Sequence, residues 1–334
     1  MGTPTTAEIA VRPRKPRSRF RKALSRYSGY ALLVALHAVV SRLPLALGRA
    51  LARLAGSIAY RILPRSRELA LENLRAALGR ERSEAEIRAI ARASFRNAAV
   101  SVVEWAILRR WKPERLVRKF PEVCGVLDRL EADVRSTGSG AVGLTGHLGN
   151  WEVLSLFFGR YKPGLLVPVA NRIYFRKYQE FFHRMRTGCG LEVVYSDESP
   201  RRIVRAIQRG AVGAFLPDAD VRTNSGIFVE FFGRPTYTVA FPMQLARRLG
   251  APYVLAFLVR EGSKFRLWYS GLRSVPRTDD EDRDAAEATQ DWTRLLEEEI
   301  RRQPSQWAWM QPRWRSTPES PRRRAGHGVR REAR

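Results

Sequence analysis

Histidine, the side chain best suited to moving protons near neutral pH, occurs four times, and only His147 stands where a predicted strand ends. The sequence there reads AVGLT, then GHLGN, then WEVLSLFF, which predicts a strand, a glycine-rich turn and a helix. Asn150 can cap that helix, and the turn lets the Glu152 carboxylate reach the imidazole. A histidine held by a carboxylate is a general base. The stretch therefore predicts proton removal from an alcohol that attacks an activated acyl carbonyl.

The surrounding sequence favours direct transfer over a covalent acyl-enzyme. The chain contains no G-x-S-x-G motif, and its two cysteines, Cys124 and Cys189, are distant from His147 in sequence. They form neither a CxxC pair nor a Cys/His cluster, so we expect no disulfide framework, no metal site and a reducing, cytoplasm-facing location. A turn histidine satisfied by the backbone would leave the same trace in the sequence, and that alternative stays open here.

The elements that must position His147 change character along the chain. Residues 66–120 are predicted to be helical, and Ser83 with Glu86 gives a capping-box signature. In the predicted core, 138–315, short β-branched runs alternate with helical stretches. The predicted strands are 141–145, 165–169, 191–195, 211–216, 252–259 and 264–270, and the predicted helices are 172–187, 200–209, 239–249 and 278–300. This pattern predicts an α/β fold with a mixed, mainly parallel sheet flanked by helices, and function at the carboxyl ends of strands.

The chain is strongly basic: its 334 residues carry a net charge of +27, with 60 Lys and Arg against 33 Asp and Glu. Twelve of these net charges lie in two Arg- and Pro-rich ends, 1–22 and 313–334. We predict disordered basic segments over 1–22 and 316–334, with an α/β domain over 66–315 between them. A basic chain seeks nucleic acid, anionic lipid or acidic protein. Because no nucleic-acid-binding motif is present, nucleic acid is the weakest of these alternatives, and we expect no such partner.

Residues 23–65 predict a helical region at a membrane surface. The stretch 27–41 carries no formal charge, but its fifteen residues fall short of the ~20 that a membrane span needs. Residues 43–63 follow with an apolar pattern interrupted by arginines, as in an amphipathic helix. We expect a monotopic protein on the cytoplasmic face of the inner membrane, without a signal peptide. Two ordinary core helices would give the same pattern, which leaves that alternative open.

Four ordered blocks of sequence resemble one family. His147-Leu-Gly-Asn-Trp-Glu152 looks like the H-x4-D/E block of membrane acyltransferases, and most like the GH-x-G-N-W-E form of the bacterial lipid A biosynthesis acyltransferase family, which includes phosphatidylinositol mannoside acyltransferases. The other blocks are Asn171 with the run from Arg184 to Gly188, LPDAD (216–220) with GIFVEFFGRPTYT (226–238), and PSQWAWMQPRWR (304–315).

This resemblance implies transfer of a fatty acyl chain from acyl carrier protein or coenzyme A to a hydroxyl of an anionic membrane glycolipid, such as a lipid A precursor. It implies a fold like that of glycerolipid acyltransferases, with 66–315 as the acyltransferase domain. It also implies no cofactor beyond the thioester co-substrate and no metal. It makes His147 the base and Glu152 its orienting partner. Five further residues would contact or shape the substrate site: Asn150, Arg184 as a donor or phosphate contact, Asp218 as an organiser of the site, and Phe231 and Gly233 at the mouth.

Two departures from the family pattern concern the acceptor more than the reaction. Ala219 stands where members commonly have Gln, and Gln311 with Pro312 stands where many have His in the terminal block. A lysophospholipid acyltransferase is the alternative with the same chemistry. Such enzymes typically show NH before the spacer and Asp after it, whereas this chain has Gly146 and Glu152. The residues therefore favour a glycolipid acceptor.

Overall fold

The computed structural model describes residues 19–220 and 226–318. Its N-terminal part is helical, as expected, and comprises α1 (Arg19–Val40), α2 (Leu45–Ile62), α3 (Pro64–Leu78), α4 (Glu84–Leu108), α5 (Pro113–Lys119) and α6 (Pro121–Ser136). The Ser83–Glu86 capping box is present at the start of α4. Of the two predicted disordered ends, 1–22 lies outside the described residues except for its last four, which begin α1, and 316–334 lies outside them from residue 319.

A six-stranded sheet forms the core, with the order β3-β2-β4-β1-β7-β8. Its strands are β1 (Ala141–Leu144), β2 (Leu166–Ala170), β3 (Val194–Tyr195), β4 (Val212–Phe215), β7 (Tyr253–Glu261) and β8 (Lys264–Tyr269). All neighbouring strands pair in parallel except β8, which returns antiparallel to β7. The predicted α/β fold, with a mixed and mostly parallel sheet, is confirmed.

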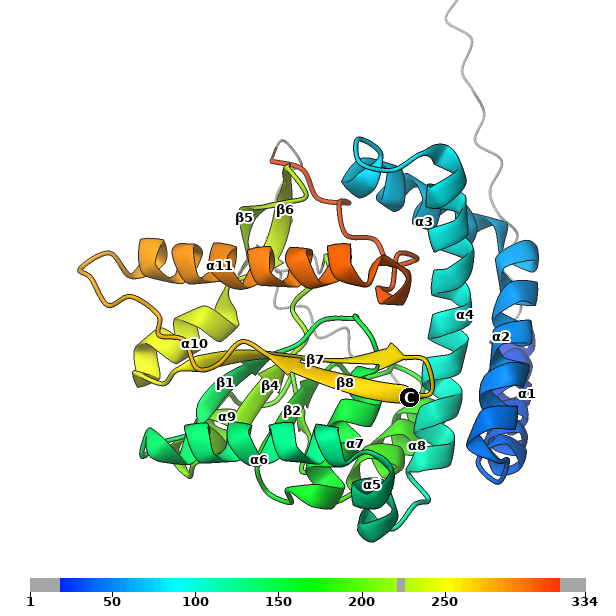
Figure 1. Cartoon of the computed structure of the whole chain (residues 1–334), viewed down its shortest axis with the longest axis horizontal. Coiled ribbons are helices and arrows are strands. Elements are labelled where there is room, and N and C mark those ends of the chain that lie inside the picture. The colour runs from blue at the N-terminus through cyan, green and yellow to red at the C-terminus, as the bar shows by residue number, and fades with distance from the viewer. Residues whose placement is uncertain (1–18, 221–225, 319–334) are drawn as a thin grey trace, which may run out of the picture.

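Helices cover both faces of this sheet, which explains why its strands read as nearly continuous apolar runs. The connecting helices are α7 (Trp151–Tyr161), α8 (Arg176–Thr187), α9 (Arg201–Gln208), α10 (Phe241–Leu249) and α11 (Glu281–Arg302). One hydrophobic cluster joins the sheet to α9, α10 and α11, and a second joins it to α5, α6 and α7. Figure 1 shows α11 and α6 on opposite sides of the strands.

A separate hairpin, β5 (Gly226–Phe231) and β6 (Arg234–Val239), packs against α11 and does not appear among the predicted strands. Its turn consists of Phe232 and Gly233, with φ angles of 54° and 67°. Positive φ at both turn residues matches the right-handed twist of a hairpin, but it normally selects Asn or Gly rather than Phe. The sequence therefore lacks the usual hairpin signal at this point.

Helix α2 packs closely along α4 through one stripe of small residues. Gly48, Ala52 and Gly56 are buried on that side, and a Cβ at Gly56 would lie 2.6 Å from the Phe95 carbonyl oxygen. A second stripe of α2 is apolar and exposed, and it consists of Leu47, Leu51, Leu54, Ile58 and Ile62. In Figure 1, α4 stands between the α1–α2 pair and the sheet. Within residues 19–220 and 226–318, no helix has both the length and the apolar character needed to cross a membrane.

Candidate active site

Two neighbouring parallel strands bring His147 and Asp218 together. Leu144 of β1 pairs in register with Phe215 of β4, and each candidate residue lies three positions beyond its strand. The His147 Nδ1 atom is 2.7 Å from Asp218 Oδ1, and the His147 backbone N–H donates to Oδ2 at 2.7 Å. A Cβ at Gly146 would lie 2.9 Å from Oδ2, so glycine allows this approach. The carboxyl ends of β1 and β4 thus form a histidine–aspartate pair.

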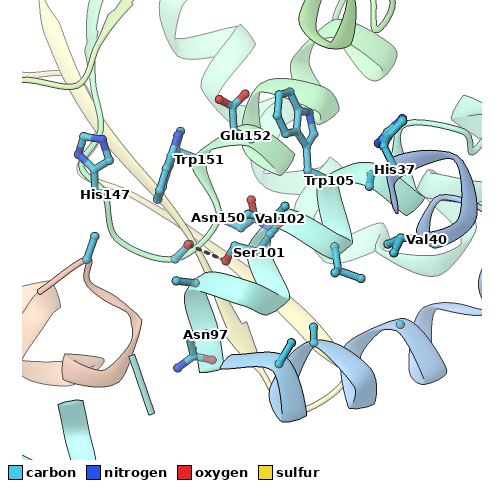
Figure 2. A pocket seen from close by; sticks show the side chains of 18 of the residues that line it. His37, Val40, Asn97, Ser101, Val102, Trp105, His147, Asn150, Trp151 and Glu152 are labelled. Atoms are coloured by element: carbon cyan, nitrogen blue, oxygen red, sulfur yellow. Dashed lines mark hydrogen bonds between the residues drawn. The ribbon is translucent and has the colours of Figure 1, made fainter. Parts of the chain in front are cut away.

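Asp218, and not Glu152, occupies the orienting position beside His147. Glu152 instead forms a two-point ion pair with the Arg186 guanidinium of α8. Asn150 caps α7, so Glu152 is the second residue of that helix and its side chain is directed toward α8. Figure 2 shows the Trp151 ring between His147 and Glu152, and the ring centroids of His147 and Trp151 are 4.8 Å apart. The expected His147–Glu152 contact is corrected to His147–Asp218.

Both members of the pair have pKa values shifted toward their charged forms. Burial lowers the pKa of His147, but the charge and hydrogen bond of Asp218, helped by the charge of Glu152, outweigh burial and raise it above 6.5. Burial likewise raises the pKa of Asp218, and the interactions with His147 and the Trp307 indole N–H, 3.0 Å from Oδ2, lower it overall. Asp218 therefore stays ionised at neutral pH and increases the basicity of the imidazole.

This shift predicts the pH dependence of any reaction in which His147 acts as a base. The imidazole accepts a proton only when neutral, and its neutral fraction rises as pH increases through its pKa. Because that pKa is raised, the acidic limb of kcat/KM should lie above pH 6.5. Steady-state rates across pH 5 to 9 would measure it, and a limb at or below 6.5 would contradict the pairing with Asp218.

Asn150 is held within the protein on both sides of its amide. Its Oδ1 accepts the Val153 backbone N–H at 3.2 Å, while Nδ2 donates to the Ser101 carbonyl and to Glu104. The side chain borders the cavity described below, but it is 2% exposed. The sequence placed Asn150 among the substrate contacts, whereas the structure uses both ends of its amide to hold the turn and begin α7.

Three other predicted residues, Arg184, Phe231 and Gly233, do not line the cavity beside His147. Arg184 is exposed on α8, and Arg186, half a turn further, is the residue of that helix that reaches Glu152. Phe231 is 0% exposed and packs against Trp307 and Trp314. Gly233 forms part of the β5–β6 turn. Neither Phe231 nor Gly233 lines the cavity, so the predicted shaping of its mouth is corrected to a core and a turn position.

A cavity of about 660 Å³ adjoins His147. Its wall is mostly apolar and comes from α1, α2, α4, the turn from His147 into α7, α8 and the C-terminal segment around Trp307. Figure 2 shows His147 at one end of the labelled residues and His37 of α1 at the other. Several lining residues, among them Leu36, Leu51 and Val102, are also exposed at the surface. The cavity therefore opens onto the apolar outer face of the N-terminal helices.

Sequence reasoning did not identify Arg186 and Trp307 as the partners of Glu152 and Asp218. Part of the signal for the His147–Asp218 contact lies in the sequence, because the strands that precede the two residues were both predicted. The sequence did not show that these strands are neighbours in the sheet. Among the described residues, no group of His, Cys, Asp and Glu side chains could hold a metal ion. Cys124 and Cys189 are buried, and burial raises the pKa of both thiols. Neither thiol is therefore a ready nucleophile.

Comparison with known proteins places the chain in a family. The family model described as bacterial lipid A biosynthesis acyltransferase matches residues 15–316. The chain belongs to this family. It is 28% identical over 204 residues to the phosphatidylinositol mannoside acyltransferase of Mycobacterium tuberculosis (strain CDC 1551 / Oshkosh), a match that covers 60% of this chain and 62% of that relative. The chain thus spans about six tenths of the mycobacterial relative's length.

Two relatives from Escherichia coli (strain K12) match over a longer region. The lipid A biosynthesis palmitoleoyltransferase is 25% identical over 266 residues, which covers 79% of this chain and 83% of the relative. The lipid A biosynthesis lauroyltransferase is 25% identical over 269 residues, with 79% and 84% covered. The family predicted from the four sequence blocks is confirmed, and it is a family of acyltransferases.

Proposed function

We propose that the protein is a membrane-associated O-acyltransferase that moves a fatty acyl chain from an acyl thioester to a hydroxyl of a membrane glycolipid. The acyl donor is a thioester of acyl carrier protein or of coenzyme A. The acceptor is a lipid A precursor or a related glycolipid such as a phosphatidylinositol mannoside. The observation that carries this proposal is the His147–Asp218 pair at the wall of a large apolar cavity. The names of the relatives support the choice of acceptor class.

The His147–Asp218 pair can act first as a general base and then as a general acid. With Nδ1–H donated to Asp218, Nε2 is free to take the proton of the acceptor hydroxyl as its oxygen attacks the thioester carbonyl. The new C–O bond forms, the C–S bond breaks, and the imidazolium returns its proton to the leaving thiolate. The products are an ester and a thiol. Asp218 remains ionised throughout, because its role is to orient the imidazole and stabilise its charged form.

In this proposal Glu152 contributes to the cavity wall rather than orienting His147. Its carboxylate is neutralised by Arg186, whose guanidinium lies over the Trp105 ring at 5.9 Å from the centroid. Both Glu152 and Trp105 line the cavity. The ion pair therefore gives the otherwise apolar wall a polar section near His147, suited to the thioester or the acceptor headgroup.

The outer face of the N-terminal helices is suited to a lipid surface. In the described residues, the exposed large apolar side chains lie on α1, α2 and residues next to them, with Val102, Ile173 and Tyr174 as the others. Clusters of exposed apolar side chains commonly mark sites of protein or membrane interaction. The cavity opens onto this same face, so an acyl chain could pass from the bilayer toward His147. We propose that the protein docks by this face on the cytoplasmic side of the inner membrane.

The function is tested by supplying both substrates to the purified chain. Labelled acyl-acyl carrier protein or acyl-coenzyme A would be incubated in turn with a lipid A precursor, a phosphatidylinositol mannoside and lysophosphatidic acid. Mass spectrometry of the lipid products should show one added acyl group on a glycolipid. Transfer to lysophosphatidic acid alone would replace the proposal with the glycerolipid alternative, and thioester loss without acyl transfer would contradict it.

The docking face gives a separate prediction. Changing Leu54→Glu together with Ile58→Glu should lower binding to anionic vesicles by at least about fivefold, because it places two charges where the apolar stripe would meet lipid. Both residues are exposed and do not line the cavity, so the folded state should be unaffected. Vesicle co-sedimentation measures the binding.

A matched control separates insertion from net charge. Ala132→Glu with Gln208→Glu makes the same charge change at exposed positions on α6 and α9. This variant should bind vesicles nearly as well as the native protein. Equal losses in the two variants would mean that general electrostatic attraction, rather than the α2 stripe, holds the protein at the membrane.

A further inference from the structure

A buried carboxylate on α4 lies behind the turn that carries His147. Glu104 is 0% exposed and binds three side chains. Arg49 Nε of α2 donates to Oε1 at 2.7 Å, and Arg260 of β7 donates to both oxygens, at 2.8 and 2.6 Å. Asn150 Nδ2 donates to Oε2 at 2.9 Å. Glu104 therefore joins α2, α4, β7 and the catalytic turn.

The cluster contains more charge than the burial of one carboxylate requires. Arg260 alone already binds both oxygens of Glu104. Arg49 adds a second buried cation whose pKa is lowered by burial, and its Nη2 has no hydrogen-bond partner among the described residues. Replacing a buried ion pair by apolar residues is often neutral or stabilising. Stability alone therefore does not account for this arrangement.

The cluster reaches the turn along two branches. In the first, Glu104 binds Asn150 Nδ2, which leaves Oδ1 to accept the Val153 N–H and cap α7. In the second, Arg260 Nη2 donates to Ser101 Oγ, and this hydroxyl donates to the Gly149 carbonyl. Figure 2 shows Ser101 and Asn150 beside the turn. Because a carboxylate only accepts hydrogen bonds when ionised, Glu104 fixes which end of the Asn150 amide faces the helix.

We propose that Glu104 is a positioning residue for acyl transfer, which holds the Asn150 amide and thereby the turn that places His147. Arg49 anchors α2, with its exposed apolar stripe, to the same carboxylate. The inference rests on the proposed function, since the turn matters for rate only if His147 is the base.

The first test is Glu104→Gln, which keeps the shape of the side chain and removes its charge. We expect kcat per folded molecule to fall at least about tenfold with KM for the acyl donor within about twofold, because Glu104 does not line the cavity. The matched control is Asp284→Asn, another buried carboxylate, bound by Arg247 and Thr278. Asp284 lies near the start of α11, on the side of the molecule away from α4 (Figure 1), and this variant should keep native kcat.

A second variant keeps the inference testable if Glu104→Gln does not fold. Asn150→Asp retains a capping oxygen for Val153 but turns a carboxylate toward Glu104, so kcat should again fall at least about tenfold. A milder variant, Asn150→Ser, keeps a hydroxyl that can cap Val153 but removes the amide that Glu104 binds, so its kcat should fall as well. Native kcat in both Asn150→Asp and Asn150→Ser would overturn the proposal.

Hydrogen exchange gives a readout that does not depend on catalysis. If Glu104 orients the Asn150 amide, the Val153 N–H should exchange at least about tenfold faster in Glu104→Gln and at the native rate in Asp284→Asn. Unchanged exchange in Glu104→Gln would overturn the positioning role. If exchange is faster in Glu104→Gln but the native protein transfers no acyl group, the link between Glu104 and the turn is supported and the proposed function is rejected. The two failures are therefore distinguishable.

Discussion

Replacing His147 with alanine should lower kcat for acyl transfer by about 10³-fold or more, because no other described side chain holds a base at this position. The fold should survive, since the backbone N–H of His147 still donates to Asp218 and the Trp307 indole still holds the same carboxylate. The measurement is a single-turnover transfer of a labelled acyl chain, together with thermal unfolding of both proteins.

His183→Ala is the matched control for loss of an imidazole. His183 lies on α8, its Nδ1 is 2.9 Å from the Tyr195 hydroxyl, and it does not line the cavity. This variant should keep kcat within about threefold of the native value. Retained transfer in His147→Ala would mean that the thioester is attacked without a protein base, and the proposed mechanism would be wrong.

The sequence predicted His147 but not its partner, for a physical reason. A strand followed by a glycine-rich turn is a local pattern, and local patterns can be read along the chain. The contact between His147 and Asp218 depends on β1 and β4 being neighbours, which is set by packing across 71 residues of separation. Glu152 was the closer carboxylate in sequence, and the cap at Asn150 directs it toward Arg186 instead.

The contrast between local sequence patterns and long-range packing also explains the other differences between the predicted and the observed structure. Most strands of the sheet were predicted because burial on both faces makes them nearly continuously apolar, and β8 was predicted from its alternation of buried apolar and more exposed residues. The β5–β6 hairpin was missed because Phe232 occupies a positive-φ turn position without the usual Asn or Gly. Glu104 carries no sequence signal at all, since a single acidic residue in a long helix is normally solvated, and only tertiary packing places two arginines around it.

Asp218→Asn should lower kcat by about 10²- to 10⁴-fold while leaving the fold intact, because it imposes the wrong tautomer on His147. The Oδ2 position accepts from both the His147 backbone N–H and the Trp307 indole, so the amide oxygen of Asn must take that place. The amide nitrogen then faces Nδ1 and donates to it. The ring proton moves to Nε2, which can no longer accept the hydroxyl proton.

The same variant should move the acidic limb of kcat/KM to lower pH. The charge of Asp218 raises the pKa of His147 against the effect of burial, so the amide removes the raising interaction and leaves burial, which lowers the pKa. Nitrogen NMR of the imidazole reports the tautomer directly. Asp220→Asn is the control, because Asp220 is also buried two residues away but binds Ser316 rather than His147.

A comparison of Asp218→Asn with Glu152→Gln decides between the two carboxylates. If Asp218 orients the base, Glu152→Gln should lower kcat less than Asp218→Asn does. The acidic limb of kcat/KM in Glu152→Gln should also move only slightly, because Glu152 makes the smallest contribution to the pKa shift of His147. The opposite order would mean that the turn rearranges when substrates bind, so that Glu152 leaves Arg186 and reaches the imidazole. In that case Glu152→Gln must both lower kcat and move the acidic limb of kcat/KM to lower pH, since a carboxylate that orients the base also raises its pKa.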